Sequence, residues 1–446
     1  MRLIFPVLAL SVISISIVSC KSKSKTGSQK ADVLAVNLDT TVSPGEDFFQ
    51  YANGGWINKN PIPAEQSAWG IGNLVIEENL KRLREISEKA AESNAAKGSP
   101  EQKIGDFWTM AMDSAKIEAD GVKPLQPWLD KVNAISDVKS LVSTVADLKK
   151  IGSSTLFSDF VTQDDKNSDV MTYKLWQGGI GLPEREYYFK NDSTTNNIRN
   201  KYVEYITGML TMAGEDAGTA NTAAKNILAL ETKLAQASRK LEDLRDPYTN
   251  YNKMAIADLG KMNAEIDWSN YLRSSGVKSI DSVIVGQPDF FKALDNVLKT
   301  VPISDWKSYV KFNLISDFAA ALPDKFGLAA FDFNKLFSGA KVRRPRWKRS
   351  IQSSENVMGE MMGQLYVKEF FNEKAKKRYE DMVEAIREAL KDRIITLSWM
   401  SDSTKQKAYV KLAAMKRKVG YPEKWKDFST MEIGRESNFQ NMASAN

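Results

Sequence analysis

The helical character of this chain is plainest at residues 367–397, which read VKEFFNEKAKKRYEDMVEAIREALKDRIITL. Met382, Ile386, Leu390 and Ile394 recur every four residues, which places them on one face of a helix, while Glu, Lys and Arg fill the opposite face. The stretch therefore predicts one long amphipathic helix, the longest in the chain, whose apolar face needs a partner.

Similar spacing predicts further helices, with little strand between them. Helices are expected at 74–96, at 136–150 with Ser136 as its cap, at 227–244, and from Ser401 onward with Ala408, Leu412 and Met415 facing inward. Two β-branched and aromatic runs, 155–161 and 170–176, flank a polar segment and predict a hairpin. The sequence thus predicts a mainly α fold with a small β-hairpin.

Composition excludes several classes of protein and of site. The 446 residues are 42% hydrophobic and 26% charged, which is typical of a globular chain long enough for two domains. The net charge of +6 is dispersed, with no basic stripe, so nucleic-acid binding has no support. The chain contains no histidine, so it cannot build a His-based zinc site or a Ser-His-Asp triad.

The first residues resemble an export signal. Arg2 precedes an apolar run that ends in Ile17-Val18-Ser19-Cys20, and small residues before a lone Cys resemble a bacterial lipoprotein cleavage box. We therefore expect residues 1–20 to be a lipoprotein signal peptide, Cys20 to be lipidated, and residues 21–35 to be a flexible basic tether. The expected location is the bacterial cell envelope, on the periplasmic face of the outer membrane, because Lys21 follows Cys20 where routing signals are commonly acidic.

An ordered series of short motifs carries a family resemblance. The motifs are Asp47-Phe48-Phe49-Gln50-Tyr51-Ala52-Asn53-Gly54-Gly55-Trp56, Asn60-Pro61-Ile62-Pro63, Trp69-Gly70, Asp106-Phe107-Trp108, Met112-Asp113, Gly181-Leu182-Pro183-Glu184-Arg185-Glu186-Tyr187-Tyr188, Arg245-Asp246-Pro247, Arg346-Trp347-Lys348, Gly363-Gln364-Leu365-Tyr366-Val367, Trp399-Met400 and Gly420-Tyr421-Pro422. In this order the series resembles the neprilysin and endothelin-converting-enzyme family of zinc metallopeptidases, bacterial oligopeptidase type, over about residues 37–430. Taken by themselves, Trp56, Trp69 and Trp399 predict core anchors and Gly54-Gly55 predicts a turn.

The resemblance implies a two-lobed enzyme that hydrolyses short peptides with zinc. In that family the zinc ligands lie in a His-Glu-x-x-His helix and on a later Glu, beyond the motifs found here. The resemblance implies that residues 36–74 pack on a catalytic lobe that is missing, that 75–395 form a helical lid lobe, and that 396–446 cross over to the truncated start of the catalytic lobe. We therefore expect zinc for the complete enzyme and no catalytic or metal-ligating residue in this chain; the substrate-binding residues are unknown.

Two positions depart from the family pattern. Ala68 precedes Trp69-Gly70 where animal members have an arginine that holds a substrate carboxylate, so release of C-terminal dipeptides is not supported. Ala111 stands where the family often has a cysteine, which fits a chain without disulfides.

Three other chemistries have weak signals. Ser-x-x-Lys occurs at Ser136–Lys139 and Ser304–Lys307, but each serine is expected to cap a helix. Asp164, Asp165 and Asp169 lack the glycine and distal glutamate of a calcium loop, so a solvated turn is expected. The sequence does not single out a carboxylate pair for glycoside hydrolysis, because the two residues of such a pair are defined by their distance in the fold and not by their spacing in the sequence.

Two functions stay open at this point. The chain is the front part of a membrane-anchored zinc endopeptidase, inactive alone and completed by a catalytic lobe in cis or in trans. Alternatively it is a lipid-anchored, non-catalytic helical protein that binds peptides or a partner, or one half of a split peptidase. On either account the segment 47–69 and the residues after Gly420 are expected to leave apolar side chains uncovered.

Overall fold

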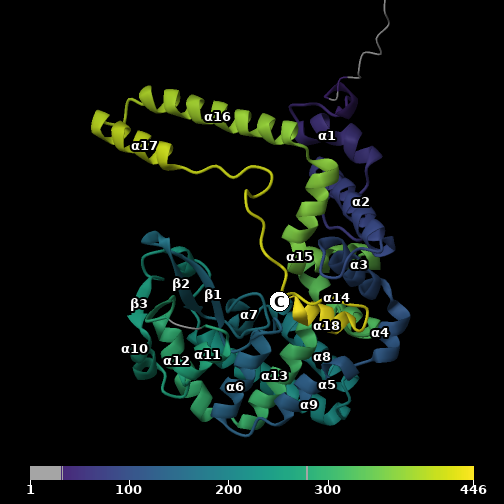
Figure 1. Ribbon diagram of the computed structural model, residues 1–446, viewed down its shortest axis with the longest axis vertical. Helices are drawn as coiled ribbons and strands as arrows, with labels where there is room; N and C mark the ends of the chain where they lie inside the picture. The colour runs from purple at the N-terminus through teal and green to yellow at the C-terminus, as the bar shows by residue number, and fades with distance from the viewer. Residues whose placement is uncertain (1–31, 33, 278–279, 446) are drawn as a thin grey trace, which may run out of the picture. The chain divides into compact units, whose positions relative to one another are not determined.

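The computed structural model describes residues 32, 34–277 and 280–445 (Figure 1). The predicted signal peptide, the predicted lipidation site Cys20 and most of the predicted tether therefore lie outside the described residues. Contacts divide the chain into two compact units, which meet in the sequence between Ile62 and Pro63. The domain boundaries expected from the sequence remain predictions.

The first unit contains a short 3-10 helix, η1 (Ala35–Asn37), and the helix α1 (Phe48–Lys59). Asp47 caps α1 by accepting a hydrogen bond from the Gln50 backbone N–H at 2.9 Å. Gly54 and Gly55 lie inside α1 and not in a turn, so that prediction was wrong. A Cβ on Gly55 would lie 2.6 Å from the Leu38 carbonyl oxygen, so glycine permits close packing of α1 on that segment.

In the second unit, one hydrophobic core joins three helices, α2 (Ile71–Glu92), α3 (Pro100–Met112) and α15 (Arg346–Phe370). Phe107, Ile351 and Met358 are fully buried in it. α2 and α3 approach closely at Gly105, where a Cβ would lie 2.4 Å from the Ala90 carbonyl oxygen. α15 is kinked at Met358.

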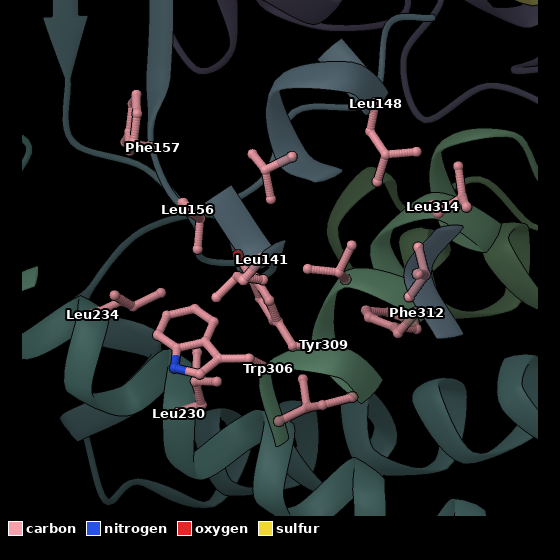
Figure 2. Close-up of a cluster of buried hydrophobic side chains, with 14 of the residues drawn as sticks. Leu141, Leu148, Leu156, Phe157, Leu230, Leu234, Trp306, Tyr309, Phe312 and Leu314 are labelled. Atoms are coloured by element: carbon pink, nitrogen blue, oxygen red, sulfur yellow. The ribbon is translucent and has the colours of Figure 1, made fainter. Parts of the chain in front are cut away.

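A larger hydrophobic core in the same unit gathers helices from residues 114 to 338. Trp306, Tyr309 and Leu141 lie at its centre with under 2% of each side chain exposed (Figure 2). The helices of this region are α4 (Ser114–Asp120), η2 (Lys123–Leu125), α5 (Gln126–Asn133), α6 (Val138–Lys149), α7 (Glu186–Phe189), α8 (Ser193–Met212), α9 (Ala217–Ala237), η3 (Asp243–Arg245), α10 (Ile256–Met262), α11 (Trp268–Ser274), α12 (Pro288–Thr300), α13 (Ile303–Asp317) and α14 (Asp324–Ser338).

The predicted hairpin is confirmed, and it belongs to a four-stranded sheet. β1 (Ser158–Asp164) and β2 (Asn167–Trp176) pair antiparallel with Val161 opposite Tyr173, and the sheet order is β1-β2-β4-β3. β4 (Ser282–Val285) runs parallel to β2, and β3 (Asn252–Ala255) runs antiparallel to β4. The sequence does not reveal these last two strands because each has only four residues.

The predicted helix at 367–397 is two helices. α15 ends at Phe370, and α16 (Glu373–Ile395) begins after Asn372, whose side chain accepts a hydrogen bond from the Ala375 N–H at 2.9 Å. Asn372 caps the N-terminus of α16, so a new helix begins there. The apolar period continues across this break, so the periodicity alone does not reveal it. The boundaries of the other predicted helices differ less from the observed ones. The helix expected at 74–96 is α2, and the helix expected at 227–244 is α9, which ends at Ala237.

Ser401 caps α17 (Asp402–Ala414) as predicted, accepting from the Thr404 N–H at 3.3 Å. Leu412 is buried, but Met415 is 59% exposed, so its predicted inward orientation was wrong. Trp399 is 75% exposed and is no core anchor, whereas Trp56 and Trp69 are half-buried. The fold class is confirmed: the described residues form a mainly α lobe with one small sheet.

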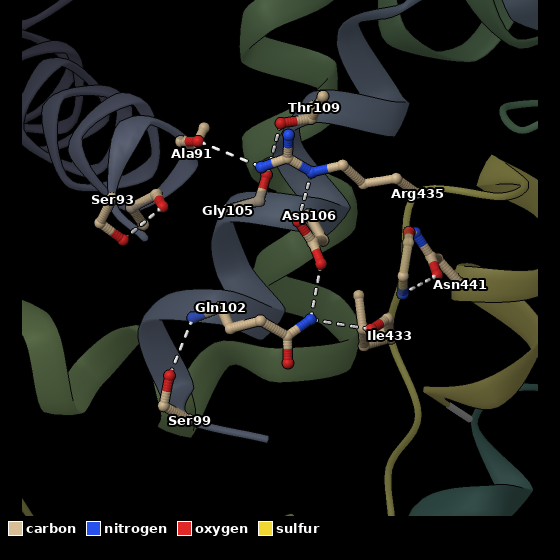
Figure 3. A network of polar contacts seen from close by, with 12 residues as sticks. Ala91, Ser93, Ser99, Gln102, Gly105, Asp106, Thr109, Ile433, Arg435 and Asn441 are labelled. Carbon is tan, nitrogen blue, oxygen red and sulfur yellow. Dashed lines mark hydrogen bonds and ion pairs between the residues drawn. The ribbon is translucent and has the colours of Figure 1, made fainter. Parts of the chain in front are cut away.

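The last described helix, α18 (Asn438–Ser444), is held by polar and apolar contacts. Figure 3 shows Arg435, which donates from Nε to Asp106 Oδ1 at 2.6 Å and from Nη2 to the Ala91 carbonyl at 3.2 Å. Phe439 is 3% exposed, and its ring centroid lies 4.8 Å from that of Phe318. The expectation that this end leaves its apolar anchors uncovered was therefore wrong for Phe439.

Candidate functional site

The donor set of the described residues does not fit zinc. The sequence holds no histidine, and across residues 32, 34–277 and 280–445 no three Cys, Asp or Glu side chains lie together as a metal-binding group would. Structural and catalytic zinc sites use Cys, His and carboxylate ligands in sets of three or four. No step that depends on zinc can therefore be assigned to these residues.

The acidic loop carries its own counter-ions. Asp164 is 3% exposed; its Oδ1 accepts from the Lys166 backbone N–H and from Tyr251, and its Oδ2 lies 3.0 Å from Lys253 Nζ. These hydrogen bonds, the one from Lys166 foremost, lower the pKa of Asp164 to about 2. Asp165 pairs with Lys174 at 2.6 Å. The predicted solvated turn was wrong for Asp164, because its carboxylate is buried and paired with protein groups.

Neither Ser-x-x-Lys serine caps a helix, contrary to prediction. Asp137 is the cap of α6 and accepts from the Ser140 N–H at 2.7 Å, while the Ser136 N–H donates to Ser140 Oγ. Ser304 lies within the first turn of α13, whose cap position is Pro302. The carboxylate of Asp137, one residue after Ser136, is a stronger hydrogen-bond acceptor than a hydroxyl, so Asp137 and not Ser136 caps α6.

A buried carboxyl group organises the Gly181–Tyr188 motif. Glu231 on α9 accepts from Tyr188 Oη at 2.6 Å, from Tyr202 Oη at 2.9 Å and from the Gly181 N–H at 3.2 Å. Glu231 is fully buried, and burial raises its pKa to about 7 despite these three donors. The group is enclosed in the core, so we assign it to holding the motif and not to catalysis.

A second buried charge lies in the Arg346-Trp347-Lys348 motif. Lys348 is 8% exposed and contacts both Glu65 and Glu77, with its Nζ 2.7 Å from Glu77 Oε1. These carboxylates raise the pKa of Lys348 above its ordinary value, although burial opposes them as the largest single influence. The motif thus ties α15 to α2 and to the chain before it.

The Gly420-Tyr421-Pro422 motif packs where α15 gives way to α16. Gly420 has φ +73°, and a Cβ there would lie 2.6 Å from the Phe371 ring. Lys376 Nζ lies 4.0 Å from the centroid of the Tyr421 ring. A cleft of about 670 Å³ borders this segment, lined by acidic and basic side chains in similar numbers.

The clearest candidate for a functional surface is the apolar face of α16. Tyr379, Met382, Ile386 and Leu390 are 46–59% exposed, whereas Ile394 on the same face is 8% exposed. α16 and α17 lie side by side as a hairpin (Figure 1). Arg417, three residues after the end of α17, lies with its Nη1 2.6 Å from Glu384 Oε2 on α16. The periodicity predicted this face, but within the described residues only its last member is covered. An uncovered apolar stripe of this kind is typical of a binding surface.

Comparison with known proteins decides the family. A family model described as Peptidase family M13 matches residues 44–422. The chain belongs to peptidase family M13. The resemblance to the neprilysin and endothelin-converting-enzyme zinc metallopeptidases is thereby confirmed.

Curated M13 relatives share about a quarter of their residues with this chain. Endothelin-converting enzyme 1 of Rattus norvegicus is 27% identical over 401 residues, which cover 86% of this chain and 52% of the relative. Neprilysin-3 of Drosophila melanogaster is 28% identical over 408 residues, covering 87% and 52%. The chain therefore spans about half the length of the curated relatives it matches.

Solved M13 structures share the fold. The zinc metalloprotease Zmp1 of Mycobacterium tuberculosis, in complex with inhibitor, is 30% identical with a TM-score of 0.86, covering 92% of this chain and 62% of that one. PepO of Lactobacillus rhamnosis has a TM-score of 0.79 at 19% identity, which shows the fold alone.

In the sequence, the motif residues indicate only the family resemblance. The hydrogen bonds and ion pairs that these residues make were not predicted. Tyr188 and Lys348 stand inside motifs that were noted, but their partners Glu231, Glu65 and Glu77 carry no local signal. A charged residue on the apolar face of a helix is the one available hint, and Glu231 fits it, between Leu230 and Leu234 on α9.

Proposed function

We propose that this chain is the front, lid-forming portion of a zinc endopeptidase that hydrolyses short peptides. The match to Peptidase family M13 over residues 44–422 carries this proposal, and the likeness to the zinc metalloprotease Zmp1 supports it. Because the donor set of these residues does not fit zinc, the metal and the catalytic carboxylate belong to a lobe that these residues lack, supplied in cis by further sequence or in trans by a second chain.

The apolar face of α16 is where we place contact with that lobe. Its four exposed side chains cost solvation free energy in water, and a partner surface would recover it at roughly 25 cal/mol per Å² buried. In this arrangement the chain positions and encloses a peptide, while the zinc lobe performs the hydrolysis. The chain alone binds no catalytic zinc and cleaves no peptide.

The test compares this chain with the product of the whole reading frame. The DNA after the Asn446 codon is read first, for a continuous or adjacent frame encoding His-Glu-x-x-His. Hydrolysis of short peptides and bound zinc are then measured for both products. We expect chelator-sensitive hydrolysis from the longer product or the two-chain mixture, and none from this chain. Chelator-sensitive hydrolysis by this chain alone would refute the proposal.

A matched pair of variants tests the α16 contact in the active protein. Ile386→Lys should lower peptide hydrolysis by tenfold or more, whereas Lys391→Gln, on the charged side of the same helix, should leave it unchanged. If both variants lost hydrolysis, or if neither did, the apolar face of α16 would not be the surface that contacts the zinc-bearing lobe.

The exposed α16 face also suits the second function, a non-catalytic peptide- or partner-binding protein. A reading frame without zinc ligands, together with a chain that binds short peptides and leaves them intact, would favour it. The same measurements therefore separate the two functions.

For location, we propose a lipid anchor at Cys20 in the bacterial cell envelope, with the chain on the periplasmic face of the outer membrane. The lone Cys after small residues supports it. Among the described helices, none has both the length and the apolar character needed to cross a membrane. Cys20→Ser should move the protein from the membrane fraction to the soluble fraction, and an unchanged distribution would contradict the anchor.

A further inference from the structure

Within the described residues, β1 is an edge strand of the four-stranded sheet. The strand order β1-β2-β4-β3 places β2 on one side of β1 and no strand on the other. The outer side of an edge strand presents backbone N–H and C=O groups that can pair with another extended chain. The hydrogen bonds around β1 and β2 show which residues present these groups.

Two contacts fix the direction in which the β1 backbone faces. The Leu175 carbonyl accepts from the N–H of Gly286, directly after β4, at 2.8 Å, so the backbone groups of Leu175 point toward β4. Leu175 and its β1 partner Asp159 are therefore a non-hydrogen-bonded pair, and the Asp159 backbone groups point outward. The Asp159 carbonyl accordingly accepts from Lys149 Nζ at 2.8 Å, outside the sheet.

Alternation along the strand extends this free edge to the next residues. The pairing of β1 with β2 is regular from Ser158 to Gln163, so the N–H and C=O of Val161 and the N–H of Gln163 also point outward. In the described part of the chain, no other group donates to them or accepts from them. β1 thus offers donors and an acceptor in the spacing of a β-ladder.

Apolar side chains border the free edge on both faces of the hairpin. Val161 and Met171 lie on one face, because Met171 pairs with Gln163, and each is 61% exposed. Phe160 and Val170 lie on the other face and are 44% and 42% exposed. β1 contains neither lysine nor proline, the residues that commonly protect an edge strand from pairing. The edge therefore suits a strand with apolar side chains.

We propose that the outer edge of β1 binds a short extended peptide, which adds to the sheet as an antiparallel strand. The inference rests on the proposed function, because the peptide is a substrate held on the lid-forming portion. Backbone groups that alternate along an edge recognise an extended chain and not a helix. Val161 exchanges two hydrogen bonds with one peptide residue, and Gln163 donates to the residue two positions away. Alternate peptide side chains contact Val161 on one face and Phe160 on the other.

The extent of the edge favours a peptide over a second copy of the chain. Regular pairing ends at the bulge after Gln163, and Lys149 occupies the outer side at Asp159, so the edge spans about five residues, roughly 17 Å. Two such edges paired together would bury less than the roughly 1,000 Å² that a stable interface needs. A short peptide gains its affinity from main-chain hydrogen bonds and needs no larger surface.

Peptide binding to this chain, followed by fluorescence polarisation, tests the inference. The probe is a pentapeptide of alternating valine and threonine with an N-terminal fluorescein and an amidated C-terminus. Its control is the same peptide methylated at every backbone nitrogen, which cannot donate to the edge. The chain should bind the probe about tenfold more tightly than the control, and equal binding of the two would overturn the inference.

Val161→Pro removes an outward N–H and keeps the β1–β2 hydrogen bonds, because Val161 and Tyr173 are a non-hydrogen-bonded pair. Probe binding should weaken about tenfold. Val161→Thr is the matched control: it keeps the N–H and the β-branched shape, so binding should stay within about threefold of that of the unaltered chain. Unchanged binding by Val161→Pro would place the peptide elsewhere and overturn the inference.

If Val161→Pro does not fold, amide hydrogen exchange of the unaltered chain takes its place. Saturating probe should slow exchange over residues 158–164 and leave α8 unchanged, and an absence of slowing would overturn the inference. Dimerisation through β1 that excludes the probe would equally overturn it, since a second copy is then the occupant.

The result is independent of the zinc-bearing lobe. Probe binding at β1 in a protein whose reading frame encodes no zinc ligands would refute the proposed function and support the peptide edge. Hydrolysis by the longer product, with no probe binding by this chain, would support the proposed function and overturn the peptide edge.

Discussion

Lys348 Nζ lies 2.7 Å from Glu77 Oε1, although the two residues are 271 positions apart in the sequence. The same ammonium contacts Glu65, so one buried cation joins the start of the second unit, α2 and α15. Both carboxylates are mostly buried, with 15% and 20% of their side chains exposed. A buried ion pair adds little net stability over an apolar replacement, but removal of one partner leaves the other charge unpaired.

Lys348→Ala should therefore lower the free energy of unfolding by about 3 kcal/mol, because two partly buried carboxylates lose their counter-ion. Urea unfolding followed by circular dichroism measures this. Lys368→Ala is the control: its side chain is 75% exposed and lies 3.9 Å from Glu101, so its effect should stay within about 0.5 kcal/mol. Equal effects of the two variants would show that Lys348 acts as a surface charge.

Stability should fall as the pH rises through the titration of Glu231. Burial raises the pKa of this carboxyl group from 4.5 to about 7, so the folded state holds a proton that the unfolded chain has released. The stabilising contribution is complete below pH 4.5 and is lost as the pH passes 7. From pH 4 to pH 8 this one group should cost about 3 kcal/mol.

Glu231→Gln removes the ionisation and keeps the shape, so its unfolding free energy should vary less with pH and exceed that of the unaltered chain at pH 8. Asp317, whose pKa burial raises to about 6, titrates in both proteins and cancels in their difference. Glu204→Gln, 63% exposed on α8, should leave the profile unchanged. If the unfolding free energies of Glu231→Gln and of the unaltered chain varied with pH in parallel, the raised pKa of Glu231 would be contradicted.

Periodicity identified the helices α2, α6, α9, α16 and α17, and β-branched and aromatic runs identified the hairpin, but the sequence analysis did not predict the remaining helices, the exact ends or the packing partners. Residues 367–397 show one apolar period, and the break at Phe371–Asn372 depends on a side-chain cap that leaves the period intact. The same period predicted an apolar face on α16, but periodicity does not show whether other residues pack against that face. The partners of Lys348 lie more than 270 residues away, so only the folded chain reveals them.

The ordered motifs predicted the family, because each is a local pattern that needs no knowledge of contacts. The roles of their residues are spatial. Glu231 lies 43 residues from Tyr188 and 29 from Tyr202, and no spacing rule joins the three. Strands of four residues, such as β3 and β4, offer too few positions for alternation to appear.

Gly181→Ala should disrupt the Glu231 network. A Cβ at Gly181 would lie 1.9 Å from Tyr202 Oη, and Tyr202 is 1% exposed and cannot move aside. We expect a loss of about 3 kcal/mol in unfolding free energy, from overpacking and a broken hydrogen bond. Gly208→Ala, inside α8 with no atom within 4 Å of its Cβ, should instead stabilise the protein by about 0.5–1 kcal/mol. Destabilisation of similar size in both would point to backbone conformation and not to the Tyr202 contact.

Phe439→Ala should release α18 from the core. The side chain is 3% exposed and packs on Phe318, so its removal should cost about 3 kcal/mol of local stability. Amide hydrogen exchange over residues 437–445 should speed up while exchange in α9 stays slow. Gln440→Ala, exposed on the same helix, should leave both rates unchanged. Acceleration throughout the second unit would mean that α18 unfolds only with the rest.

Ile386→Ser on the exposed α16 face should change the unfolding free energy of this chain by less than about 0.5 kcal/mol, because its side chain is already 59% in water. The buried Ile394 lies two turns further along the same face, and Ile394→Ser should cost about 2–3 kcal/mol. Urea unfolding measures both. Binding of an apolar fluorescent dye should fall with Ile386→Ser, since it removes part of the exposed stripe. A large stability loss from Ile386→Ser would show that the face is already packed within this chain, and it would then be unavailable to a zinc-bearing lobe.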